Sequence, residues 1–168
     1  STSLDFELST ATSSASFEIS TADTLLFGKY FFLEEAKKCG VQIAVENLFC
    51  LHKENKKKLT ANACSTGLEL AATVDALGDP FVACIDVGHS GLAGQSAAEM
   101  IRTLGKKRLH ALHIHDNDGT AAKHMTIGDG NIDFGNVFKK LRRYMGNYII
   151  EARSLESAVE SLDRLNAL

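Results

Sequence analysis

The sequence predicts an α/β fold in which parallel strands alternate with helices. Four short apolar runs follow one another along the chain, and a stretch with helical periodicity separates each run from the next. Two of these runs are almost continuously apolar. Such runs are typical of strands in a parallel sheet that helices cover on at least one face.

The predicted strands cover residues 41–46, 81–87, 109–115 and 148–151, and the predicted helices cover residues 29–39, 66–77, 95–104 and 134–144. Gly40 marks the end of the first helix, because a residue with positive φ often follows a helix. Ser154 is the predicted N-cap of a last helix. No capping box is expected there, because Ser157 stands where a capping box has Glu or Gln.

The chain divides into a Ser/Thr-rich segment, residues 1–28, and a domain over residues 29–168. Half of residues 1–24 are Ser or Thr. Within this segment, residues 4–8 and 16–20 alternate between apolar and polar and predict two short strands, with a poorly ordered tail as the alternative. The lysine-rich residues 53–58 are predicted to form a solvated loop.

The composition is that of an ordinary globular domain, with 168 residues, 45% hydrophobic residues and a formal net charge of −3. No run approaches the roughly 18 apolar residues that span a bilayer. The near-neutral charge gives no overall basic field for nucleic acid, so a nucleic-acid partner is disfavoured. No signal-peptide pattern and no C-x-x-C pair are present, and we expect a cytoplasmic protein with reduced thiols.

Each predicted strand ends in residues that can bind a metal or move a proton. The residues concerned are Glu46 after the first strand, Asp86 and His89 after the second, His113 and His115 in the third, and Glu151 in the fourth. Ligands of parallel α/β folds bind outside the carboxyl ends of the strands. The sequence therefore predicts a single site at this end of the sheet.

Two glutamates, one aspartate and one histidine form an oxygen-rich set of metal donors. This set favours Mn²⁺ or Mg²⁺ and is also compatible with Co²⁺ or Zn²⁺. His113 and His115 are two residues apart, so they face the same way on a strand and only one of them needs to bind the ion.

Five ordered motifs carry a resemblance to a known family. They are Ile43-Ala44-Val45-Glu46-Asn47, Ile85-Asp86-Val87-Gly88-His89, His113-Ile114-His115-Asp116-Asn117, Gly128-Asp129-Gly130-Asn131-Ile132-Asp133-Phe134 and Ile149-Ile150-Glu151. With them, residues 29–168 resemble the sugar phosphate isomerase/epimerase family, the xylose-isomerase-like TIM barrels that include endonuclease IV. A complete (β/α)₈ barrel takes about 250 residues. The resemblance therefore implies a partial TIM (β/α) barrel whose first half is missing or replaced.

The resemblance also implies residue roles. The divalent metal would be held by Glu46, Asp86, His113 and Glu151. His113 is preferred over His115 because it stands three residues before Asp116, as in the H-x-x-D motif of the family. Glu46 and Glu151 would form the proton donor–acceptor pair, acting beside a metal-polarised carbonyl.

Four further residues are candidates for substrate contact. His89 resembles the substrate-contacting histidine of the family, and His124 resembles the second histidine of the endonuclease branch. His115 shares the strand face of His113. Arg153 shares the face of Glu151 and is predicted either to contact a substrate anion or to form a surface ion pair.

The predicted function is a divalent-metal-dependent sugar or sugar-phosphate isomerase/epimerase that transfers a proton next to a carbonyl through a metal-stabilised enediolate. One alternative is a truncated barrel relative without enzymatic activity. Another is an endonuclease IV-like phosphodiesterase on abasic DNA, which Ala122 disfavours, because the endonuclease has a zinc-binding Asp at that position. A homodimer, or the two strands predicted within residues 1–28, would complete the barrel.

Overall fold

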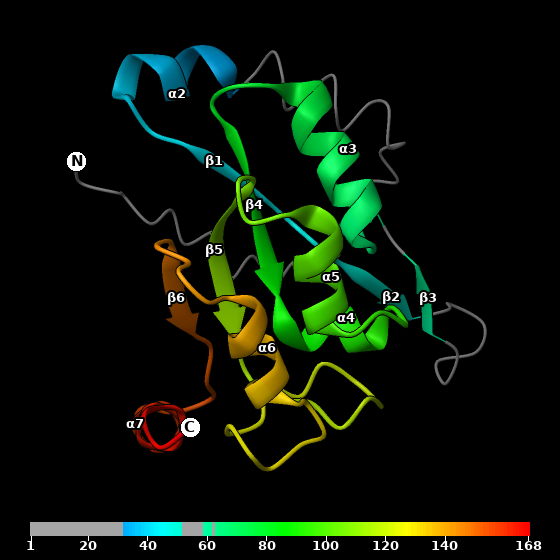
Figure 1. Ribbon diagram of the computed structural model, residues 1–168, viewed down its shortest axis with the longest axis vertical. Coiled ribbons are helices and arrows are strands. Elements are labelled where there is room, and N and C mark those ends of the chain that lie inside the picture. Colours follow the sequence, from blue (N-terminus) through cyan, green and yellow to red (C-terminus); the bar gives the residue numbers. More distant parts are fainter. Residues whose placement is uncertain (1–31, 52–58, 62) are drawn as a thin grey trace.

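The computed structural model describes residues 32–51, 59–61 and 63–168, and in them strands alternate with helices as the sequence predicts. Four strands form one parallel sheet in the order β1-β4-β5-β6 (Figure 1). The elements are α2 (Leu33–Cys39), β1 (Ile43–Glu46), β2 (Phe49–Leu51), β3 (Leu59–Ala61), α3 (Gly67–Leu77), β4 (Phe81–Asp86), α4 (Val87–Leu92), α5 (Ala97–Leu104), β5 (Leu109–Ile114), α6 (Phe134–Lys140), β6 (Asn147–Ile150) and α7 (Leu155–Asn166).

Helices α3, α5 and α6 lie side by side against one face of the sheet (Figure 1). The core forms between them and the strand residues that face them, such as Ile85 and Leu112, which are both fully buried. Every residue of the central strand β4 is buried. Residues that alternate with these core positions, including Cys84 and Asp86, point to the other face of the sheet.

The helix ends follow from local sequence. Gly40 ends α2 in the left-handed region, with φ of 65°, as predicted. Thr66 caps α3 and forms a capping box with Glu69. The expectation for α7 was wrong, because Ser154 and Ser157 do form a capping box. The Ser157 hydroxyl replaces the usual carboxylate, since it is close enough to accept from the Ser154 backbone N–H at 3.2 Å.

One helix and one pair of strands were not predicted. Residue 87 does not extend the second predicted strand but begins α4, because the Asp86 side chain caps this short helix and accepts a hydrogen bond from the His89 N–H at 2.8 Å. The segment after β1 contains an antiparallel pair, β2 and β3, on either side of the lysine-rich residues. Residues 53–58 and the strands predicted within residues 1–28 lie outside the described residues.

The last strand and the last helix carry exposed apolar side chains. Tyr148 on β6 is 46% exposed, and Leu155, Val159 and Leu162 on α7 are at least 49% exposed. In a βα unit such side chains are normally covered by the next strand and helix. The predicted homodimer would cover them and stays a prediction. Among the described residues, no helix is long and apolar enough to cross a membrane.

Candidate metal centre and active site

The four predicted metal ligands lie together at the carboxyl end of the sheet. Because the strands are parallel, Asp86 of β4 pairs in register with His113 of β5, and Glu46 ends the neighbouring strand β1. Glu151 directly follows β6, and its N–H donates to the Ile114 carbonyl at 3.0 Å. This pairing of parallel strands brings Glu46 and Glu151, which are more than 100 residues apart in sequence, to the same end of the sheet.

His113 lies between the two glutamates. Its Nδ1 is 3.2 Å from Oε1 of Glu151 and 3.5 Å from Oε1 of Glu46. Donor atoms of Asp86, His113 and Glu151 all lie within 4.8 Å of one another, and so do donor atoms of Glu46, Asp86 and His89. These distances are those of ligand atoms that surround one divalent ion.

The donor chemistry also fits a cation. Nδ1 of His113 is buried and makes no hydrogen bond, although carboxylates surround it. The Cys84 thiol and the Glu46 carboxylate raise the pKa of His113 above its ordinary value. The carboxylate oxygens beside this nitrogen form, together with it, a donor set that can bind a divalent cation in place of a proton. Glu46, Asp86, His113 and Glu151 would hold it.

Asp86 is the most buried of the four, and two groups hold its carboxylate. Its carboxylate lies 3.1 and 3.2 Å from Nε2 of His115 and accepts the His89 N–H. Burial would raise the pKa of Asp86, but the hydrogen bond and charge of His115 outweigh burial and lower the pKa. Asp86 is therefore a fixed carboxylate.

His115 lies behind Asp86, and its side chain is fully buried. Its Nδ1 is 3.2 Å from the Asp116 carbonyl, so both ring nitrogens have a partner. Burial disfavours the charged ring, yet the Asp86 carboxylate raises the pKa of His115. A Cβ at residue 88 would overlap the His115 ring, which explains the glycine there. The predicted substrate contact of His115 stays a prediction.

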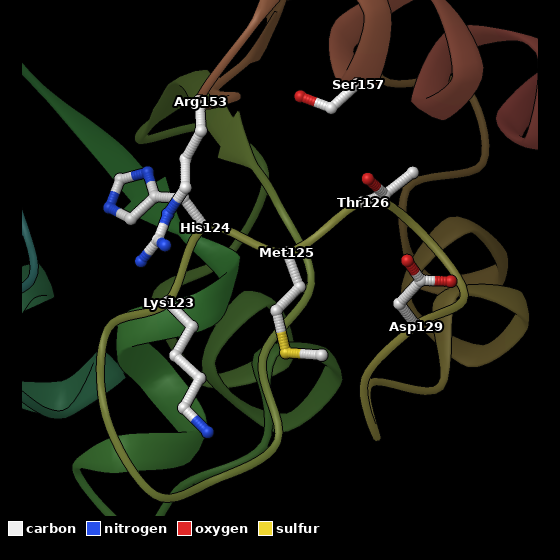
Figure 2. A pocket seen from close by; sticks show the side chains of 7 residues that line it. All are labelled: Lys123, His124, Met125, Thr126, Asp129, Arg153 and Ser157. Atoms are coloured by element: carbon white, nitrogen blue, oxygen red, sulfur yellow. The ribbon is translucent and has the colours of Figure 1, made fainter.

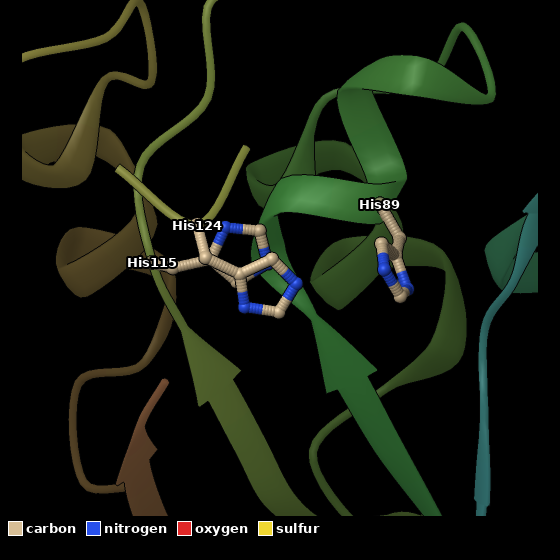
Figure 3. Close-up of side chains that lie close together, drawn as sticks. All are labelled: His89, His115 and His124. Carbon is tan, nitrogen blue, oxygen red and sulfur yellow. The ribbon is translucent and has the colours of Figure 1, made fainter. Parts of the chain in front are cut away.

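His89 and His124 flank His115 from different elements, α4 and the loop after β5 (Figure 3). The His124 ring stacks on His115 with centroids 4.0 Å apart and an interplanar angle of 7°. Its Nδ1 is 3.4 Å from Oε2 of Glu151. Burial and the charge of His115 lower the pKa of His124. A neutral imidazole at the rim can both donate and accept hydrogen bonds.

His89 stands at the opposite side of the cluster. Its Nδ1 is 3.2 Å from the Asn47 carbonyl and 3.5 Å from Oε1 of Glu46. The Phe49 ring packs against it with centroids 4.8 Å apart. His89, His115 and His124 also have nitrogen atoms within 4.8 Å of one another. Three of the predicted contact residues, His89, His115 and His124, thus lie beside the predicted ligands, and Arg153 lines a neighbouring cavity with His124.

The sequence did not assign a role to Asp116, which organises the loop that carries His124. Its carboxylate is buried and accepts four backbone N–H groups, from Asn117, Gly128, Gly130 and Ile132, at 2.7 to 3.2 Å. The backbone of Asp116 also pairs with Met125. The sequence did contain a pattern that indicates this role. Asp116 ends the H-x-x-D motif, and a buried carboxylate needs several close donors, which the backbone of the glycine-containing Gly128–Asp133 motif can supply.

Asn47 is a second residue whose role was missed. Its side chain is fully buried, accepts from the Asp86 N–H at 2.7 Å and donates to the Asp86 carbonyl at 3.1 Å. It therefore continues the pairing of β1 with β4 beyond Glu46, the last paired residue of β1. This contact fixes the distance between the strands that carry Glu46 and Asp86.

Comparisons with known proteins agree with this geometry. Residues 30–168 match the sequence profile of the xylose isomerase-like TIM barrels. The chain belongs to this family. An uncharacterised protein of Methanocaldococcus jannaschii is 32% identical over 139 residues, which are 79% of this chain and 44% of that protein.

Two solved structures of the family share the fold. A D-tagatose 3-epimerase-like protein is 27% identical with a TM-score of 0.69, over 80% of this chain and 49% of that one. Endonuclease IV from Thermus thermophilus is 20% identical with a TM-score of 0.58, over 85% of this chain and 56% of that one. The chain thus spans about half the length of its relatives, and its fold is a partial barrel.

Proposed function

We propose that the protein is the metal-binding and catalytic part of a sugar isomerase or epimerase that moves a proton next to a carbonyl group. The observation that carries this proposal is the position of His113, whose buried and unbonded Nδ1 lies between the carboxylates of Glu46 and Glu151. The 27% identity to a D-tagatose 3-epimerase-like protein supports the same reaction class.

Glu46 and Glu151 act as the acid–base pair. They approach His113 from opposite edge strands, and each side chain is 30% exposed, so each can reach a substrate. One glutamate takes the proton from the carbon next to the carbonyl, which breaks the C–H bond and leaves an enediolate. The other glutamate returns a proton to that carbon from the opposite face, and the configuration inverts.

A divalent metal ion, with Mn²⁺ or Mg²⁺ favoured, supplies Lewis-acid stabilisation of the negative charge on the substrate oxygens. Asp86 and His113 keep the site in place, since they pair in register on the central strands and are less exposed than the glutamates. His89 and His124 stand at the rim, where they can hydrogen-bond to substrate hydroxyls. His115 acts as a positioning residue that orients Asp86 through its Nε2.

Deuterium exchange tests the proposal. The protein is incubated in D₂O with Mn²⁺ and a panel of ketopentoses and ketohexoses, with and without a terminal phosphate. The expected result is deuterium at the carbon next to the carbonyl, seen by proton NMR, and its loss in Glu46→Gln and Glu151→Gln. Absence of Mn²⁺ binding by calorimetry would overturn the proposal.

The same experiment distinguishes the proposed enzyme from the alternative of a barrel relative without enzymatic activity. That alternative gives Mn²⁺ binding without deuterium exchange for any sugar of the panel. Because the chain spans about half the length of its relatives, the assay is repeated with the full-length Methanocaldococcus jannaschii relative as a reference. Exchange by that protein and none by this chain would favour the alternative without activity for this chain.

A further inference from the structure

A cavity of about 400 Å³ opens next to the metal cluster, between the loop after β5 and the start of α7 (Figure 2). Its lining residues are Lys123, His124, Met125, Thr126, Asp129, Arg153 and Ser157. His124 is shared with the site, because its Nδ1 lies 3.4 Å from Glu151. A substrate that reaches Glu151 therefore has this cavity within the length of a few carbon atoms.

Arg153 gives the cavity its uncompensated charge. Lys123 is paired with Asp118, and Asp129 is paired with Arg164 at 2.6 Å. Within the described part of the chain, the Arg153 guanidinium has no ion pair and no hydrogen bond. Figure 2 shows the Arg153 side chain extending along His124 into the space above Lys123. This wall of the cavity therefore carries a net positive charge.

A hydroxyl donor remains on the other side of the cavity. It belongs to Thr126, which lies near Ser157, whose own hydroxyl already donates to the Ser154 carbonyl at 3.0 Å (Figure 2). A guanidinium offers two parallel N–H groups to an oxyanion, and a hydroxyl can donate to one of its remaining oxygens. The carboxylate of Asp129 repels a bound anion only weakly, because the Arg164 guanidinium neutralises its charge. Arg164 also donates to the Ile127 carbonyl at 2.6 Å.

We propose that this cavity binds the terminal phosphate of a phosphorylated ketose while the reacting carbons lie between Glu46 and Glu151. The proposal rests on the proposed function and narrows its substrate class to sugar phosphates. A tetrahedral dianion uses the Arg153 fork and the Thr126 hydroxyl, and the volume admits a phosphate with its attached CH₂ group. Arg153 is the residue that sets this specificity.

The first test compares a ketose with its terminal phosphate ester. The wild-type protein should exchange deuterium into the phosphate ester with a kcat/KM at least about 10-fold higher than into the free sugar. Arg153→Gln should remove this preference by raising KM for the ester, because a charged hydrogen bond is lost. Arg102→Gln, an exposed arginine on α5, is the matched control and should leave the preference unchanged.

The second test needs no turnover. Inorganic phosphate is titrated into the metal-free chain and followed by calorimetry, with Mn²⁺ affinity measured separately. Wild type and Arg102→Gln should bind phosphate equally, and Arg153→Gln should bind it at least about 10-fold more weakly with unchanged Mn²⁺ affinity. Equal phosphate affinity in all three proteins, or a wild-type preference for the free sugar, would overturn the phosphate subsite and leave the epimerase proposal intact.

Discussion

The central and edge strands contribute to the site in different ways. Strands β4 and β5 carry Asp86 and His113, and His115 directly follows β5; the side chains of Asp86 and His115 are completely buried. Strands β1 and β6 lead to Glu46 and Glu151, which are each 30% exposed. Asp86 and His115 are fixed by hydrogen bonds, whereas the ion-pair partners of the edge glutamates, among the described residues, are the histidines of the cluster.

This difference indicates that the central residues and the edge residues have different roles in the site. A ligand that must keep its position is placed where packing and hydrogen bonds restrain it. A group that must take and return a proton needs contact with the substrate and freedom to change its charge. We therefore expect substitutions of the edge glutamates to remove proton transfer along with a proposed metal ligand, and substitutions at the centre to change stability or metal affinity.

The largest expected effect is on catalysis at the edge. Glu46→Gln and Glu151→Gln should each lower deuterium exchange by about 100-fold to 10,000-fold, because the amide cannot take the proton. The urea midpoint of unfolding should stay close to that of the wild type, since both side chains are partly exposed. A large loss of stability in either variant would contradict the division between edge and centre.

At the centre, Asp116→Ala should lower the free energy of unfolding by about 3–5 kcal/mol. The substitution leaves four backbone N–H groups, one of them buried, without their acceptor. Urea denaturation measures the change. Asp163→Ala on the exposed side of α7 is the control and should alter stability by less than about 0.5 kcal/mol. Similar midpoints for the two variants would show that Asp116 does not hold the loop.

The positioning role of His115 predicts a smaller change in metal affinity. His115→Leu should weaken Mn²⁺ binding by about 10-fold to 100-fold, because Asp86 loses the donor that orients it. His115→Gln, which keeps an N–H donor, should recover part of the affinity in calorimetry. His110→Leu removes a histidine that contacts Gln42 away from the cluster and should leave the affinity unchanged. Equal affinity in all variants would exclude the role.

The smallest expected effect concerns the two glycines of α4. Gly88→Ala should destabilise the protein by about 1–3 kcal/mol, because its Cβ would overlap the buried His115 ring. Gly91→Ala meets no atom within 4 Å and should be neutral or stabilise the helix by up to about 1 kcal/mol. Thermal unfolding of both variants measures the contrast. Equal shifts would mean that the His115 ring can move aside.

Local patterns predicted much of this molecule. The order of strands and helices, the parallel sheet and the donor residues at the strand ends follow from the apolar runs. The proposed ligand set, with His113 in preference to His115, came from the family resemblance. Helix α4 was missed because it is short and depends on the Asp86 cap. The role of Asp116 was missed because its partners lie up to 16 residues further along the chain.

The sequence by itself determined the family, the partial barrel and the chemical nature of the donors, because these depend on residue type and spacing. Only the tertiary structure decided that His113 lies between the glutamates while His115, which follows the end of β5, lies behind Asp86. The physical reason is that burial and hydrogen-bond partners come from neighbouring strands and loops. Strand register and packing, and not spacing along the chain, decide which histidine is placed as a proposed metal ligand and which histidine supports Asp86.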